Sequence, residues 1–276
     1  MPKAKINDIS ISYKVHGQGE PLVLIMGLGG AKWSWIFQTL AFKKFYQVIT
    51  FDNRGVGRTD KPSEPFTVKT MADDTIGLMD HLGADRAHIL GVSLGGMIAQ
   101  EIAINYPERV NKLILGCTTS GLDDEINRED YDSKLPETFG LKDDFSIKDI
   151  QNLDLRNVDF SKVMSHLTRL AFNKRHYRIL LAQLSKLYVK INGYNGLIGQ
   201  LEAARKHSTL DRLHMIRAPT MVITGTEDRL VPPHSSETLA EKISNAKLVK
   251  VEGGSHSFPA EMRKQFNKEV LNFLRE

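Results

Sequence analysis

Apolar residues in the first third of the chain follow two patterns in turn, short runs and helical spacings. Short apolar runs between turn signals are typical of strands buried on both faces of a parallel sheet; they occupy 22–25, 47–51, 88–92 and 112–115. Between them, apolar residues recur every three or four positions, which predicts helices over 71–82 and 94–103. We therefore expect crossover connections and a mostly parallel sheet covered on both faces.

This alternation stops near residue 121. From there to residue 208, apolar residues recur only at helical spacing and no buried strand is predicted. Strands and helices then alternate again, over 220–225, 235–243, 246–251 and 259–274. The pattern predicts an α/β fold, with a core domain of residues 1–121 and 209–276 and an inserted helical cap domain of residues 122–208.

The composition adds few constraints. The 276 residues are 41% hydrophobic and 25% charged, as in folded globular chains, which excludes disorder of the whole chain. A net charge of +4 is too small to indicate a nucleic-acid partner. We see neither an apolar run long enough for a membrane span nor a signal peptide, so we expect a cytoplasmic protein. We expect it to be a monomer or a homodimer. A single cysteine, Cys117, permits no internal disulfide and no cysteine-based zinc site; we expect a buried thiol.

Charges divide the predicted cap into two parts. Residues 123–159 contain 12 acidic and 5 basic side chains, and residues 160–208 contain 9 basic and 1 acidic. Two solvated faces that neutralise each other explain this split most simply. The alternative is a basic wall that attracts an anionic substrate.

The segment Gly91-Val-Ser93-Leu-Gly95 has the spacing G-x-S-x-G, directly after an apolar run and at the start of a helical pattern. There the chain must turn so sharply that small residues are needed on both sides of the serine. The turn holds the hydroxyl at a helix N-terminus, where the helix dipole favours developing negative charge. Ser93 is therefore the predicted nucleophile, with an ordinary strand–helix turn as the alternative.

A serine nucleophile needs a base, and that base needs an acid to orient it. Of the nine histidines, His256 lies in a glycine-rich loop after the last predicted strand, at the sheet edge where Ser93 is expected. His234 follows two prolines at the start of a predicted helix, where capping or exposure explains it better. We predict His256 as the base.

Asp228 directly follows the strand predicted over 220–225. It lies between the other two residues in the chain, which gives the order serine, acid, histidine. Its close rival is Glu227; Asp123 and Asp124, after an earlier strand, are distant ones. We predict Asp228 as the acid.

Two backbone amides are predicted to stabilise an oxyanion. Leu94 follows the nucleophile, and its N–H is the first donor. Leu28 lies in Gly27-Leu-Gly-Gly after the first buried run, where glycines let amides face a cavity, and its N–H is the second. A nucleotide loop of the form G-x-G-x-x-G would need glycine where the chain has Lys32, and neither a Walker lysine nor H-E-x-x-H occurs. We expect no cofactor and no metal.

Together these segments resemble the α/β-hydrolase superfamily, specifically its capped esterase and lactonase branch. The resemblance covers residues 6–121 and 209–275. The matching segments are Gly27-Leu-Gly-Gly, Phe51 to Asp60, the G-x-S-x-G turn around Ser93, Gly225-Thr-Glu-Asp-Arg-Leu-Val-Pro-Pro and Gly253-Gly-Ser-His256. It implies Ser93, Asp228 and His256 as the triad, the amides of Leu28 and Leu94 as oxyanion donors, and a structural role for Arg54. Many relatives have histidine where this chain has Met26, which leaves open how the oxyanion loop is braced, because a thioether cannot donate a hydrogen bond.

The resulting expectation is a carboxylesterase: a serine hydrolase that cleaves carboxylic esters of small to medium acyl chains through an acyl-enzyme. Residues around Ser93 and Cys117 also resemble 3-oxoadipate enol-lactonases. An enol-lactone or an acyl thioester is therefore the alternative substrate, and the distant alternative is a ligand-binding protein without turnover.

Overall fold

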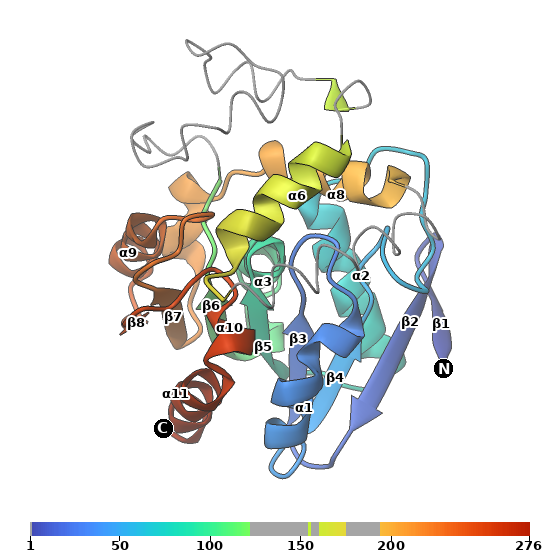
Figure 1. Cartoon of the computed structure of the whole chain (residues 1–276). Helices are drawn as coiled ribbons and strands as arrows, with labels where there is room; N and C mark the ends of the chain where they lie inside the picture. The colour runs from blue at the N-terminus through green and yellow to red at the C-terminus, as the bar shows by residue number, and fades with distance from the viewer. Residues whose placement is uncertain (1, 122–153, 156–159, 175–193) are drawn as a thin grey trace.

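A computed structural model describes residues 2–121, 154–155, 160–174 and 194–276 of the chain. At its centre lies an eight-stranded sheet in the order β1-β2-β4-β3-β5-β6-β7-β8 (Figure 1). The strands are β1 (Lys3–Ile6), β2 (Ile9–His16), β3 (Pro21–Ile25), β4 (Gln47–Phe51), β5 (Ala87–Val92), β6 (Val110–Gly116), β7 (Thr220–Gly225) and β8 (Ala246–Val251). All neighbouring pairs from β4 to β8 are parallel, whereas β1–β2 and β2–β4 are antiparallel. The predicted fold class is confirmed.

Helices cover both faces of this sheet. The described helices are α1 (Ile36–Phe42), α2 (Val68–His81), α3 (Leu94–Asn105), α6 (Phe160–Ala171), α8 (Asn195–Arg205), α9 (Pro233–Lys242), α10 (Phe258–Glu261) and α11 (Arg263–Arg275), with short 3-10 helices η1 (Lys32–Trp35), η2 (Pro107–Arg109) and η5 (Leu210–Met215). Successive residues of β3 enter different cores: Val23 and Ile25 pack with α2 and α3, whereas Leu22 and Leu24 pack with α1 and α11. Burial on both faces explains why such strands are apolar throughout.

Four parallel strands end at one edge of the sheet and lead into the loops that hold the predicted site. These strands are β3, β5, β7 and β8, which end at Ile25, Val92, Gly225 and Val251. Helices α6 and α8 lie above this edge (Figure 1). The topology therefore brings segments that are distant in the chain to one place.

Most of the predicted cap, residues 122–153, 156–159 and 175–193, lies outside the described residues. Its two ends lie side by side, because Gly121 and Ser208 form an isolated antiparallel bridge. The division into core and cap stays a prediction. In the part of the chain that the structure describes, no helix is long and apolar enough to cross a membrane.

Candidate active site

Ser93 lies at the turn between β5 and α3. Its φ of 55° is positive, a backbone conformation that side chains other than glycine adopt at a cost. A Cβ at Gly91 would collide with the backbone of Gly95, and a Cβ at Gly95 with the carbonyl of Ile25. The close approach of strand and helix thus requires glycine on both sides of the serine.

Asp228 and His256 form a buried acid–base pair between the loops after β7 and β8. His256 Nδ1 lies 2.8 Å from Asp228 Oδ2. The other carboxylate oxygen accepts hydrogen bonds from the N–H groups of Leu230 and Val231, both at 2.9 Å. The Asp228 side chain has no exposed surface, whereas 10% of the His256 side chain is exposed. The aspartate is therefore fixed by three donors, and the imidazole retains access to solvent.

One short segment at the end of β6 contacts both Ser93 and the acid–base pair. Thr118 Oγ1 donates to Ser93 O at 2.8 Å. The preceding Cys117 has its Sγ within 4.8 Å of a carboxylate oxygen of Asp228 and a ring nitrogen of His256. Among the described residues, no hydrogen bond joins Ser93 Oγ to His256; such bonds are often long before substrate binds.

Cys117, Asp228 and His256 are also the one group of metal-ligating side chains that lie close together in the described residues. The hydrogen bonds named above already engage both oxygens of Asp228 and one ring nitrogen of His256. Burial raises the pKa of the Cys117 thiol well above its usual value, so the thiol stays protonated at neutral pH. This chemistry suits proton transfer better than metal binding.

The close rival acid, Glu227, makes no hydrogen bond to His256 in the described structure. Glu227 is exposed, and its Oε2 accepts a hydrogen bond from Asn173 Nδ2 at 2.6 Å. Asp123 and Asp124 lie outside the described residues. Geometry thus favours Asp228 as the acid.

The predicted oxyanion loop lies against Ser93. A Cβ added to Gly27 would lie 3.0 Å from Ser93 Cβ and 3.6 Å from its Oγ. Gly30 N–H donates to Gly27 O at 3.0 Å and closes a tight turn around Leu28. Within the described residues, the N–H groups of Leu28 and Leu94 have no protein acceptor. Both amides are available to an oxygen atom of a substrate, and their role as donors stays a prediction.

Two amide side chains brace this loop. Asn53 Nδ2 donates to Met26 O at 2.8 Å, and Gln200 Oε1 accepts from Gly29 N–H at 2.9 Å. The sequence analysis found neither residue. Asn53 lies in a recognised motif next to Arg54, which was a weak signal, whereas Gln200 lies in a predicted cap segment without any motif.

Arg54 has the structural role that the resemblance implied. Its buried guanidinium binds the carboxylates of Asp8 and Asp74 at 2.6–2.9 Å. This hydrogen bonding lowers the pKa of Asp8 to about 2. Arg54 therefore joins the start of the chain to α2 on the same face of the sheet.

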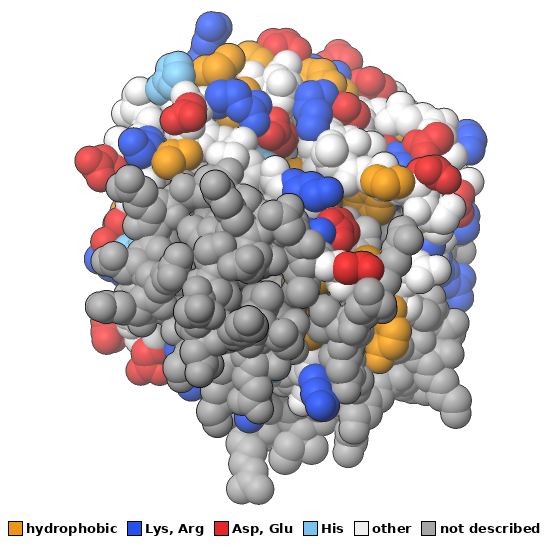
Figure 2. Space-filling model, turned by 90° about the horizontal axis from the view of Figure 1, so that it is seen from above, with side chains coloured by type: hydrophobic (Ala, Val, Ile, Leu, Met, Phe, Trp, Pro, Cys, Tyr) orange, Lys and Arg blue, Asp and Glu red, His pale blue; other side chains and the backbone are white. Residues whose placement is uncertain are grey.

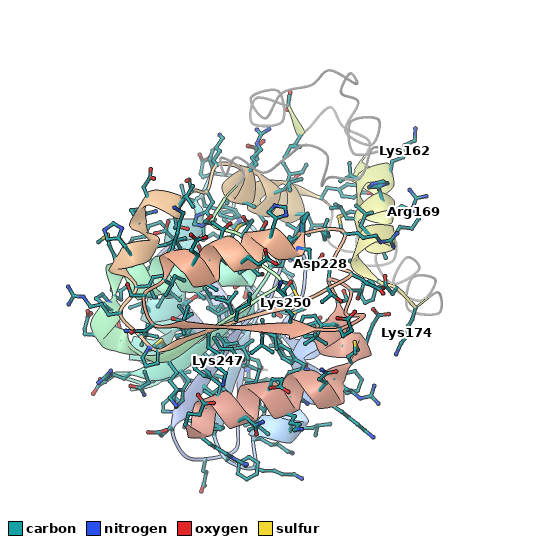
Figure 3. All side chains as sticks on the ribbon, turned by 90° about the vertical axis from the view of Figure 1, so that its left-hand side faces the viewer. Lys162, Arg169, Lys174, Asp228, Lys247 and Lys250 are labelled. Carbon is teal, nitrogen blue, oxygen red and sulfur yellow. The ribbon has the colours of Figure 1, made fainter. Side chains whose placement is uncertain are left out.

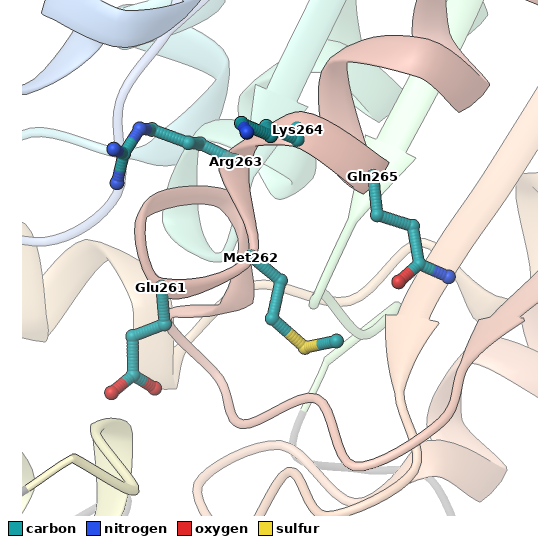
Figure 4. A pocket seen from close by; sticks show the side chains of 5 residues that line it. All are labelled: Glu261, Met262, Arg263, Lys264 and Gln265. Carbon is teal, nitrogen blue, oxygen red and sulfur yellow. The ribbon is translucent and has the colours of Figure 1, made fainter.

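Glu261, at the end of α10, joins the loop of His256 to the segment after α6. Its carboxylate accepts hydrogen bonds from Ser255 Oγ and from the N–H groups of Asn173 (3.2 Å) and Lys174 (2.8 Å). Figure 4 shows its side chain turned away from the other side chains that line a surface pocket at the α10–α11 junction. The loop of His256 and the segment after α6 are thus joined by a buried carboxylate.

Comparison with known proteins identifies the family of this arrangement. The family profile described as alpha/beta hydrolase fold matches residues 20–261. The chain belongs to the α/β-hydrolase fold family. The resemblance seen in the sequence is thereby confirmed.

Relatives of this α/β hydrolase have several different names. The chain is 32% identical over 273 residues to a protein of Caulobacter sp. (strain K31) provisionally named carbamate hydrolase RutD. The matched region covers 95% of this chain and 94% of that relative. It is 32% identical over 280 residues to a Mycobacterium tuberculosis protein provisionally named non-heme bromoperoxidase BpoC, with 96% and 98% covered. A solved enol-lactonase from Burkholderia xenovorans LB400 covers the whole chain and is itself covered in full, with a TM-score of 0.83 and 24% identity. The chain is a hydrolase of this fold whose substrate class the relatives leave open.

The described basic residues of α6 and of the segment after it extend away from the acid–base pair. In Figure 3, Lys162, Arg169 and Lys174 lie along α6 and the segment after it and extend away from Asp228. Lys174 Nζ donates to Glu261 O at 3.1 Å. Viewed from above the sheet edge, the described surface shows cationic and anionic side chains intermixed (Figure 2). The basic residues between 175 and 190 lie outside the described residues.

Proposed function

We propose that this α/β hydrolase cleaves carboxylic esters of small to medium acyl chains, with Ser93 as nucleophile, His256 as base and Asp228 as acid. The observation that carries the proposal is the 2.8 Å hydrogen bond from the His256 ring to a fully buried carboxylate. A carboxylate at Nδ1 fixes the tautomer that leaves Nε2 free to accept a proton. The strained turn at Ser93 supplies the hydroxyl that acyl transfer requires.

In the first half-reaction, Ser93 Oγ attacks the ester carbonyl carbon while its proton passes to His256 Nε2. The carbonyl electrons move onto oxygen, and the N–H groups of Leu28 and Leu94 donate hydrogen bonds to the resulting oxyanion. The intermediate then collapses, the bond from carbon to the leaving oxygen breaks, and the departing alcohol takes the proton from His256. Asp228 stays ionised and stabilises the imidazolium throughout.

In the second half-reaction, water replaces the alcohol. His256 removes a proton from the water as its oxygen attacks the acyl-enzyme carbonyl. The same two amides stabilise the second oxyanion, and Ser93 Oγ leaves with the proton that His256 held. The products are the carboxylic acid and the free enzyme.

Carbamates are a second candidate substrate class, because the RutD relatives are named for carbamate hydrolysis and match nearly the whole chain. The same attack applies, since a carbamate presents an acyl carbon bonded to oxygen and nitrogen. Lactones are a further candidate substrate class. A lactone is an internal ester, so the same attack opens the ring and the leaving alcohol stays attached to the acyl group. An anionic thioester has less support, because the labelled cations of α6 extend away from Asp228.

The test measures turnover of p-nitrophenyl acetate, butyrate and octanoate, a γ-lactone and a carbamate ester by the wild type, Ser93→Ala and the exposed control Ser244→Ala. We expect ester hydrolysis by the wild type and the control, and a loss of about 10³-fold or more in kcat for Ser93→Ala. A fluorophosphonate probe should label the wild type at Ser93. Wild-type turnover by Ser93→Ala, or an unlabelled and inactive wild type, would overturn the proposal.

A further inference from the structure

Gln200 of α8 joins two loops near Ser93. Its Oε1 accepts from Gly29 N–H at 2.9 Å, and its Nε2 donates to Arg54 O at 2.8 Å. The side chain is fully buried, and both partners lie more than a hundred residues earlier in the chain. If the Gln200 amide rotated by half a turn, its NH₂ group would face the Gly29 N–H and its oxygen would face the Arg54 carbonyl. Both hydrogen bonds would be lost, so the orientation of this buried amide is fixed.

The turn that Gln200 contacts carries the predicted Leu28 donor. The hydrogen bond from Gly30 N–H to Gly27 O makes Leu28 and Gly29 the two central residues of that turn. Gly29 has φ 66°, as the third residue of a type II turn does. Gln200 holds the N–H of the peptide between Leu28 and Gly29, which directly follows the peptide that carries the Leu28 N–H.

Helix α8 is a rigid support for this contact. Leu197, one turn before Gln200, is buried, and a Cβ added to Gly29 would lie only 2.7 Å from its Cδ2. The backbones of Gly196 and Gly55 are packed so closely that a Cβ at Gly196 would overlap the Gly55 carbonyl. These two close contacts, Leu197 with Gly29 and Gly196 with Gly55, therefore fix α8 against both loops.

We propose that Gln200 is a positioning residue that holds the oxyanion turn so that Leu28 N–H faces the developing oxyanion. This inference rests on the proposed function, and it supplies the loop with a brace where Met26 cannot donate a hydrogen bond. Donors that are set before the charge develops need no reorganisation in the transition state. Gln200 therefore acts on kcat, and substrate affinity in the ground state depends little on it.

The test compares Gln200→Met, which has a similar length but neither amide group, with Gln38→Met. Gln38 is an equally buried glutamine with two hydrogen bonds, to Pro259 O (2.8 Å) and Asn267 Oδ1 (3.1 Å), away from the oxyanion loop. We expect Gln200→Met to lower kcat on p-nitrophenyl butyrate about 10-fold with KM changed less than about 2-fold, and to weaken inhibition by phenylboronic acid in parallel. Gln38→Met should change thermal stability alone.

If Gln200→Met does not fold, Gln200→Asn carries the same expectation, because the shorter amide cannot reach both partners. Wild-type kcat and boronate affinity in a folded Gln200 variant would overturn the inference and leave the proposed function intact. Equal losses of kcat in the Gln38 and Gln200 variants would also overturn it. Failure of the proposed function is separate, because it is read from the wild type and Ser93→Ala.

Discussion

At the scale of single residues, Asp228 shows how backbone donors select a side chain. Leu230 and Val231 direct their N–H groups at Oδ1, so an amide at this position would place its oxygen there and its NH₂ group toward His256. The ring would then present a lone pair at Nδ1 and a proton at Nε2, which is the wrong tautomer for a base. The two backbone donors thus make a carboxylate necessary.

We therefore predict that Asp228→Asn folds and lowers kcat for ester hydrolysis by about 10³–10⁴-fold. The measurement is steady-state kinetics on p-nitrophenyl butyrate, with circular dichroism as the check of folding. Glu227→Gln is the matched control, because this neighbouring carboxylate is exposed and bonds Asn173 instead. A larger loss of kcat for Glu227→Gln than for Asp228→Asn would show that the wrong acid has been chosen.

The residues that sequence analysis located share one property. Ser93, Asp228 and His256 lie in the turns and loops that follow β5, β7 and β8, so local pattern and topology together place them at one edge of the sheet. Asn53 and Gln200 were not predicted, because their contacts join segments that are distant in the chain and such contacts leave no local pattern in the sequence. Hydrogen bonds that hold a loop from a distant segment therefore become visible only in the three-dimensional structure.

At the scale of elements, α6 is attached by its C-terminal end to the loops of the acid–base pair. Ser257 N–H donates to Ala171 O at 2.9 Å, and the N–H groups of Asn173 and Lys174 donate to Glu261. Carbonyl and amide groups at the end of a helix need such partners. The anchor thus couples the position of α6 to the loop that carries His256.

Glu261→Gln should loosen this anchor, because a neutral amide has one acceptor oxygen for donors that now share two. We expect hydrogen exchange to accelerate at the amides of Asn173 and Lys174, and the unfolding free energy to fall by about 1–2 kcal/mol. Glu252→Gln, at an exposed position in the loop after β8, is the control. Unchanged exchange at both amides would mean that α6 is held elsewhere.

Strands and helices could be predicted from the sequence where burial imposes a regular pattern of apolar residues. The runs that became β3 to β7 are apolar because both faces of the sheet are covered there, and α2 and α3 show regular spacing. The region of η1 and α1 was missed because Trp33, Ile36 and Leu40 are exposed while Trp35 and Phe42 are buried, which obscures the helical period. Trp35 packs in the core, whereas 62% of Trp33 is exposed.

At the scale of the whole molecule, His207 links stability to pH. It is buried where the predicted cap returns to the core, with Nδ1 3.6 Å from Glu101 Oε1, and Glu101 in turn pairs with Arg212 at 2.7 Å. Burial lowers the pKa of His207 from 6.5 to about 4. Between these pH values the unfolded chain binds more protons than the folded one, so stability rises with pH across this window and is lost as pH falls.

His207→Gln should remove part of that dependence, because glutamine is similarly polar and does not titrate. We expect the wild type to lose about 3 kcal/mol at most from this group between pH 7.5 and 4, and His207→Gln to lose correspondingly less over the same interval. Urea unfolding at several pH values measures how much unfolding free energy each protein loses on acidification. Comparing these losses cancels any pH-independent change in stability that the substitution causes. His214→Gln is the control, because His214 is exposed in η5. If His207→Gln and the wild type lose the same stability on acidification, the folded and unfolded chains protonate this histidine alike, and His207 does not link stability to pH.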